Sequence, residues 1–122
     1  GSGGTLLSAL RQELSTCRRA RLAVAFVMTS GVELLDADLR RALLRGAQIQ
    51  LLTTDYLDVT EPDALRRLLG LGPGCEVRVF LAGSRSFHPK AYLFEREDGS
   101  GRAFVGSANL SRSGLDGGVE WT

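Results

Sequence analysis

The stretch LAVAFVM at residues 22–28 decides the fold class, because it is a short, unbroken apolar run that stops at the turn-forming sequence TSG at residues 29–31. Strands that are solvated on one face alternate apolar and polar residues, whereas strands covered on both faces are apolar throughout. We therefore expect a central strand here, buried on both of its faces.

Amphipathic helices are predicted on both sides of this strand. The first is predicted over about residues 5–18, because apolar residues recur there at helical spacing. These residues are Leu6, Leu7, Leu10, Leu14 and Cys17. The second follows the strand and carries Leu34, Leu35, Leu39, Leu43 and Leu44. Gly46 comes directly after it, where a left-handed residue commonly ends a helix.

The rest of the chain continues as alternating elements and then changes to a hairpin. The predicted elements are strands at 49–53 and 76–81, a helix between them that Thr60 caps and Pro62 opens, and hairpin strands at 88–94 and 102–105 around a polar turn at 95–101. This order predicts an α/β fold, with a mixed β-sheet flanked by helices.

The length of 122 residues fits a single domain, which we expect over residues 5–122. Residues 1–4 read as a linker or an expression remnant. The chain opens without methionine and stops just after a strand-like segment, so we expect a domain cut from a larger protein.

Composition narrows the function classes. The 15 basic and 14 acidic residues nearly balance, so anion binding must be local rather than a property of the net charge. Two distant cysteines, Cys17 and Cys75, fit neither a zinc site nor a disulfide scaffold, which favours a reduced, cytoplasmic setting. No apolar run approaches the roughly 20 residues of a membrane span, so we expect no membrane partner.

His88 and Lys90 are the only histidine and the only lysine of the chain. Residues two apart on a strand point to the same face, so an imidazole and an ammonium are expected side by side, which suits a phosphate. Taken alone, such a pair is more often a solvated feature of a strand edge than a catalytic site.

Two further polar groups follow the predicted hairpin. The sequence Gly106-Ser107-Ala108-Asn109 ends its second strand and would return a hydroxyl and a carboxamide beside the strand of His88. By themselves these are ordinary turn residues. Glu120 lies in an apolar, strand-like stretch, where a carboxylate needs a partner.

Together these residues resemble the phospholipase D superfamily, whose signature is His-x-Lys, then four residues and Asp, then Gly-Ser-x-Asn, with a later Glu in many members. The sequence departs from that signature at one position: Glu95 stands where the family has aspartate. Alternation along the strand turns position 95 away from Lys90, so we expect Glu95 to support the structure rather than to touch substrate.

The resemblance implies a phosphodiesterase in which His88 attacks phosphorus to form a phosphohistidine. Lys90 and Asn109 would hold the phosphate oxygens, Ser107 would add a hydrogen bond, and Glu120 would orient the histidine, with Gly106 and Glu95 as supporting residues. No metal or cofactor is expected. The mechanism uses two histidines, so we expect a homodimer that shares the site across its two-fold axis; the alternative is a histidine from sequence outside this chain.

A closer resemblance concerns residues 53–57, 86–93 and 118–121, which look like the phospholipase D-like domains at the N-terminus of bacterial superfamily II helicases of restriction-type systems. It implies a nuclease module acting on nucleic acid, with DNA as the expected substrate and a covalently linked helicase in the parent protein. Two alternatives stay open: a DNA-binding or dimerisation module with little catalysis, and a phospholipid phosphatidyltransferase of the same chemistry.

Overall fold

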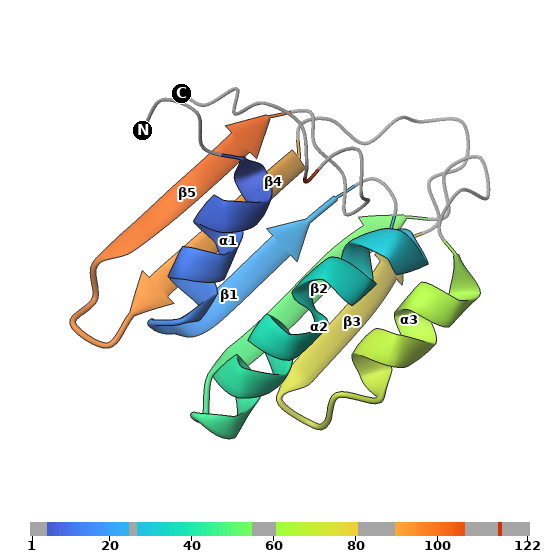
Figure 1. Cartoon of the computed structure of the whole chain (residues 1–122), viewed down its shortest axis with the longest axis horizontal. Helices are drawn as coiled ribbons and strands as arrows, with labels where there is room; N and C mark the ends of the chain where they lie inside the picture. The colour runs from blue at the N-terminus through green and yellow to red at the C-terminus, as the bar shows by residue number, and fades with distance from the viewer. Residues whose placement is uncertain (1–4, 25–26, 55–60, 81–89, 107–114, 116–122) are drawn as a thin grey trace.

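The computed structural model describes residues 5–24, 27–54, 61–80, 90–106 and 115 (Figure 1). The described part of the chain forms an α/β fold with three helices and five strands. In chain order these are α1 (Leu6–Leu14), β1 (Cys17–Ala23), α2 (Thr29–Leu44), β2 (Gln48–Thr54), α3 (Pro62–Leu69), β3 (Cys75–Phe80), β4 (Lys90–Arg96) and β5 (Gly101–Gly106).

The five strands form one mixed sheet in the order β3-β2-β1-β4-β5. Strands β1, β2 and β3 run parallel, while β4 runs antiparallel to both of its neighbours, β1 and β5. The predicted fold class is therefore confirmed, including the change from βα units to a hairpin. The expected central strand is also present, since β1 is the middle strand.

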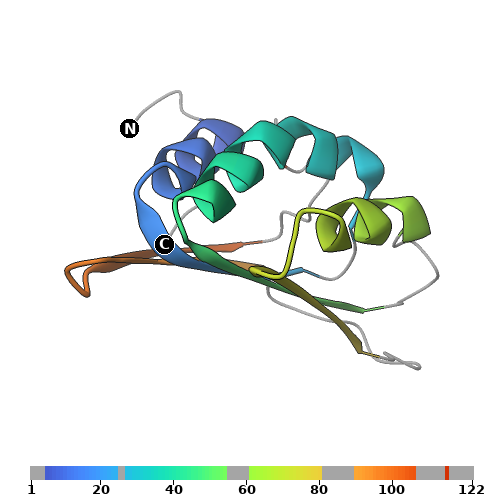
Figure 2. The ribbon, with the colours of Figure 1, turned by 90° about the horizontal axis from the view of Figure 1, so that it is seen from below.

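All three described helices lie on one side of the sheet (Figure 2). The residues of β1 that face them, Ala20 and Leu22, are buried, while Arg21 between them is exposed on the opposite face. The expectation of a strand over 22–28 with two buried faces was therefore wrong. The strand begins five residues earlier and has one apolar face, because described helices cover only one side of the sheet.

The first helix also ends sooner than its apolar spacing predicted. Its N-terminus is capped by Thr5, whose side chain accepts a hydrogen bond of 3.1 Å from the Ser8 backbone N–H. Its last helical residue is Leu14, and the hydroxyl of Ser15 donates to the Gln12 carbonyl at 2.6 Å. Cys17 therefore belongs to β1 rather than to the helix, although it is buried in the same core.

Helix α2 ends as the sequence predicted. Gly46 has a φ of 96°, a left-handed value that glycine adopts without strain. Its N–H bonds to the Leu43 carbonyl, and the N–H of Ala47 bonds to the Ala42 carbonyl, both at 3.0 Å. This pair of hydrogen bonds is the Schellman pattern, and it turns the chain directly into β2.

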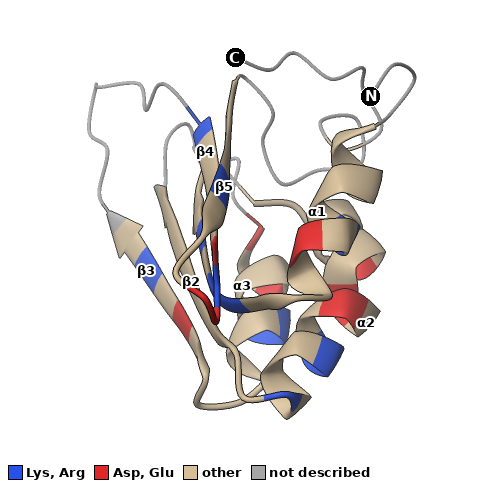
Figure 3. Cartoon of the chain, turned by 90° about the vertical axis from the view of Figure 1, so that its left-hand side faces the viewer, with Lys and Arg blue, Asp and Glu red and all other residues tan. Residues whose placement is uncertain are grey.

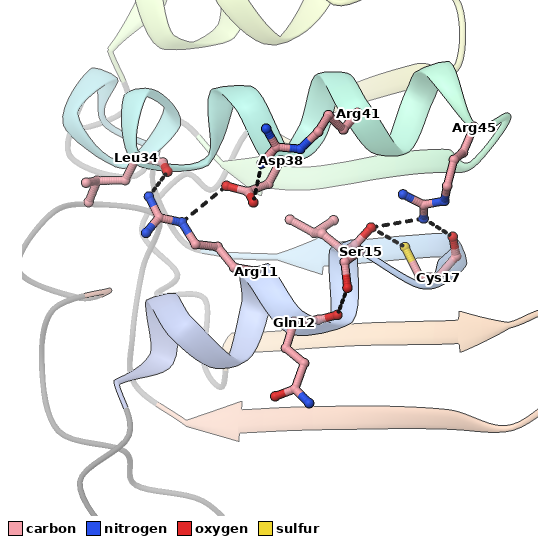
Figure 4. Close-up of polar contacts among 9 residues, drawn as sticks. Arg11, Gln12, Ser15, Cys17, Leu34, Asp38, Arg41 and Arg45 are labelled. Carbon is pink, nitrogen blue, oxygen red and sulfur yellow. Dashed lines mark hydrogen bonds and ion pairs between the residues drawn. The ribbon is translucent and has the colours of Figure 1, made fainter.

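Polar contacts fasten α1 to α2 over the sheet (Figure 4). Asp38 on α2 accepts from Arg11 of α1 and from Arg41, each at 3.2 Å. Arg45, just past α2, donates to the carbonyls of Leu14 and Cys17 at 3.0 and 2.7 Å. Arg45 thereby satisfies the Leu14 carbonyl, which the end of α1 leaves open, and the carbonyl at the start of β1.

A buried carboxylate fastens the hairpin to α1. Glu13 is 3% exposed, and its Oε1 lies 2.8 Å from Arg96 Nη2 at the end of β4. Its Oε2 lies 3.6 Å from Arg102 Nη1 on β5. Because a buried charge is stable only when it is paired, these two arginines hold α1 and the β4–β5 hairpin in one arrangement.

Candidate active site

Each of the five strands has one of its ends along the same edge of the sheet. Strands β1, β2, β3 and β5 finish at this edge, and β4 begins there (Figure 1). In open α/β sheets, ligands bind beyond the carboxyl ends of the parallel strands. The fold therefore provides a place for a site at the edge where Lys90 lies.

Lys90 and Gly106 are directly paired residues of β4 and β5. They are 16 positions apart in the sequence (106 − 90), yet the antiparallel register makes them neighbours. Lys90 belongs to the His-x-Lys motif, and Gly106 opens the Gly-Ser-x-Asn motif. The hairpin thus brings one described residue of each motif together.

The side chain of Lys90 belongs to the buried face of the sheet. It is 5% exposed, and the next residues of the same face, Tyr92 and Phe94, are 1% and 4% exposed. A lysine is rarely buried to this extent unless its ammonium is paired, because an unpaired buried charge is costly. The position suits an ammonium that meets an anion at the end of the strand.

The remaining predicted site residues lie outside the described residues. These are His88, Ser107, Asn109 and Glu120. Their proposed roles stay predictions from the sequence.

Glu95 lies on the opposite face of β4 from Lys90, as the alternation predicted. Its Oε1 is 2.7 Å from Arg18 Nη2. The hydrogen bond from Arg18 and the charge of the same guanidinium lower the pKa of Glu95, and the charges of Arg19 and Arg21 lower that pKa further. Glu95 therefore stays ionised and joins β4 to β1 away from the candidate site.

The sequence reasoning missed two residues near this edge. Thr53, the second-last residue of β2, is 1% exposed, and its Oγ1 has no hydrogen-bond partner among the described residues. Glu61 accepts from the Thr29 backbone N–H at 2.7 Å and so covers the N-terminus of α2. Thr53 lies in the run 53–57 that carries part of the family resemblance, but the sequence assigned no role to it or to Glu61, because a threonine at a strand end and an acid in a loop are ordinary there.

Most of the described arginines are already paired with acidic side chains, and both signs of charge occur on α2 and on β3 (Figure 3). The described helical arginines therefore lie beside acidic side chains rather than in a patch of one charge. A groove of about 340 Å³ lies near the other end of β1 and β2, lined in part by Arg19, Arg21, Gln48 and Gln50.

No group of three or more His, Cys, Asp or Glu side chains in the described ranges is arranged to hold a metal ion. Over the same ranges, no helix has the length and apolar character required to cross a membrane.

The family model described as "Cardiolipin synthase, PLD-like domain" matches residues 10–122. No curated protein sequence matches the chain significantly. Among solved structures, NucT from Helicobacter pylori superposes with a TM-score of 0.63 at 15% sequence identity, covering 93% of this chain and 72% of NucT. At that identity the likeness to NucT concerns the fold alone.

Proposed function

The chain belongs to the phospholipase D-like domain family, and from this we propose that it is a phosphodiesterase, a nuclease that cleaves nucleic acid through a phosphohistidine on His88. The observation that supports the proposal is the pairing of Lys90 with Gly106, which are the described residues of the two family motifs. The burial of Lys90 adds to it, because a nearly enclosed ammonium suits an anionic substrate.

The proposed reaction has two steps. The imidazole of His88 attacks phosphorus, a bond forms between nitrogen and phosphorus, and the bond to the leaving oxygen breaks while a second histidine supplies its proton. Water then attacks phosphorus, the bond to nitrogen breaks, and the second histidine accepts the proton of the water. Each step replaces one substituent of phosphorus by another, so the reaction needs no redox partner.

The other site residues would stabilise charge. Lys90 and Asn109 would bind the nonbridging oxygens, which carry the charge that builds up in the transition state, and the hydroxyl of Ser107 would add a hydrogen bond. Glu120 would accept from the second ring nitrogen of His88 and fix its tautomer. Neither this chemistry nor the proposal uses a metal ion or a cofactor.

The second histidine is proposed to come from a second copy of the chain. His88 is the only histidine in the sequence, so a single copy supplies only half of the acid and nucleophile pair. A two-fold axis would place two identical sets of site residues across one phosphate.

DNA is the proposed substrate, in the setting of a parent protein that also carries a helicase of a restriction-type system. Support comes from residues 53–57, 86–93 and 118–121, which resemble helicase-linked domains of this family. The same phosphohistidine chemistry would serve a phosphatidyltransferase, in which an alcohol replaces water as the acceptor.

The test compares the wild-type chain with His88→Ala and with Gln12→Ala, an exposed control on α1. Each is incubated in excess EDTA with labelled DNA, with RNA, and with phospholipid vesicles plus an alcohol, while light scattering gives the mass in solution. We expect a dimer whose DNA cleavage persists in EDTA, is lost in His88→Ala and is unchanged in Gln12→Ala.

Other outcomes would separate the alternatives. DNA binding without product would favour a binding module, and transfer to the alcohol would favour a phosphatidyltransferase. Cleavage that EDTA abolishes, or that His88→Ala retains, would contradict the proposed mechanism.

A further inference from the structure

Thr53 is a buried polar residue that the fold alone does not explain. It lies on the inward face of β2, after Ile49 and Leu51, which are 2% and 0% exposed. Its own exposed fraction is 1%, and its Oγ1 has no hydrogen-bond partner among the described residues. Valine has nearly the same shape and would fill this place without the unfavourable burial of an unpaired hydroxyl.

The register of the sheet places Thr53 in line with Lys90. Leu52 of β2 pairs with Ala23 of β1, and Ala23 pairs with Ala91 of β4. One residue further toward the candidate-site edge stand Thr53 on β2 and Lys90 on β4. Both belong to the buried face, and two strand spacings, or about 10 Å, separate their backbones.

The residue between them offers no partner for either side chain. Val24, directly after β1, is fully buried, and its N–H bonds to the Leu52 carbonyl at 3.0 Å, which continues the register. Its side chain can neither donate nor accept a hydrogen bond. Val24 therefore cannot link the Thr53 hydroxyl to the Lys90 ammonium by a hydrogen bond, whereas a water molecule could.

We infer that Thr53 is a positioning residue of the proposed phosphodiesterase site, whose hydroxyl binds an ordered water that also contacts the Lys90 ammonium when a phosphate occupies the site. The inference rests on the proposed function. Within the described part of the free chain the buried hydroxyl has no hydrogen-bond partner, and in the loaded site it gains one. The unpaired hydroxyl thereby lowers the stability of the free chain, and the hydrogen bond that it gains favours the binding of phosphate. Such an exchange of stability for binding is common at functional sites.

The test uses substitutions that separate the hydroxyl from the shape of the side chain. Thr53→Val keeps the shape and removes the hydroxyl, whereas Thr53→Ser keeps the hydroxyl and removes a methyl group. Thr16→Val removes an exposed hydroxyl elsewhere and serves as the control. Each variant is measured for thermal stability, for kcat and KM, and for the increase in Tm that inorganic phosphate produces.

We expect the more stable of the two Thr53 variants to be the less active one. Thr53→Val should be at least as stable as wild type and lose about 3- to 10-fold in kcat, the effect of one hydrogen bond, with a smaller phosphate-induced rise in Tm. Thr53→Ser should be less stable yet retain most of the kcat. The control should match wild type in all three measurements.

The outcomes also separate this inference from the proposed function. A Thr53→Val protein with wild-type kcat and a wild-type response to phosphate overturns the role of Thr53 and leaves the phosphodiesterase intact. An inactive wild-type chain overturns the phosphodiesterase. In that case, the increase in Tm that phosphate produces still tests Thr53. A smaller increase in Thr53→Val than in wild type supports the hydroxyl as part of an anion site. An equal increase in both, or no increase in either, overturns the role of Thr53.

Discussion

At the scale of single residues, strand alternation predicted which side chains share a face but could not identify Thr53. Lys90 and Glu95 are five residues apart on β4, an odd separation, and they lie on opposite faces. A threonine near a strand end, by contrast, reads as an ordinary strand former. Its relation to Lys90 depends on the register of three strands, which is set by contacts distant in the sequence.

Glu95 is predicted to matter for acid stability and not for catalysis. Its pKa is lowered by Arg18, so its contribution to stability is present above the ordinary glutamate value of 4.5 and is lost as the pH falls through the lower, folded value. Glu95→Gln should therefore weaken the dependence of stability on pH below 4.5, measured by urea unfolding. Its kcat at neutral pH, and that of Glu95→Asp, should equal wild type. A loss of kcat in both variants would show that position 95 acts on the site.

Cys75 is predicted to be unreactive in the folded chain. Burial raises the pKa of its thiol to about 11 from an ordinary value of 9.0, so its contribution to stability is complete below pH 9.0 and is lost as the pH rises toward 11. Burial also raises the pKa of Cys17. At pH 8 a thiol reagent should label neither residue until guanidinium chloride unfolds the chain. Rapid labelling of the native protein would contradict the buried placement.

At the scale of elements, periodicity predicted the type of each described segment more reliably than its bounds. Helical spacing from Leu6 to Cys17 continued past the true end of α1, because Cys17 is buried in the same core although it lies on β1. The arginines at positions 18, 19 and 21 precede the apolar run from which the strand was predicted. They are accommodated because β1 has one face without a described helix and a register shift between Cys17 and Arg19.

The contact between α1 and the hairpin is predicted to be a main source of stability. Glu13→Gln would leave Arg96 without its carboxylate beside a buried amide, and we expect a loss of about 1–3 kcal/mol in the free energy of unfolding, reduced from a fully buried pair because Arg96 is 34% exposed. Urea unfolding of wild type and variant measures this loss in the free energy of unfolding. The control is Arg66→Gln, which breaks an exposed pair with Asp63 and should change stability little. Equal effects of the two substitutions would contradict the account.

At the scale of the whole molecule, the alternation of strands and helices predicted the α/β class, since each βα unit is readable locally. The strand order and the placement of all described helices on one face were not predictable in this way, because they depend on long-range pairing. The same limit applies to the site. The motifs could be recognised in the sequence, but the meeting of Lys90 with Gly106 becomes visible only in the register of β4 and β5.

The most direct test of the central claim is to trap the covalent intermediate. Wild-type chain and His88→Ala are mixed with DNA that carries a label on the phosphate-bearing fragment, quenched within the first turnover in alkali, where a phosphohistidine survives, and mapped by mass spectrometry. We predict labelled phosphate on His88 of the wild type and none on the variant. Turnover without any labelled histidine, or equal labelling of His88→Ala, would contradict the account.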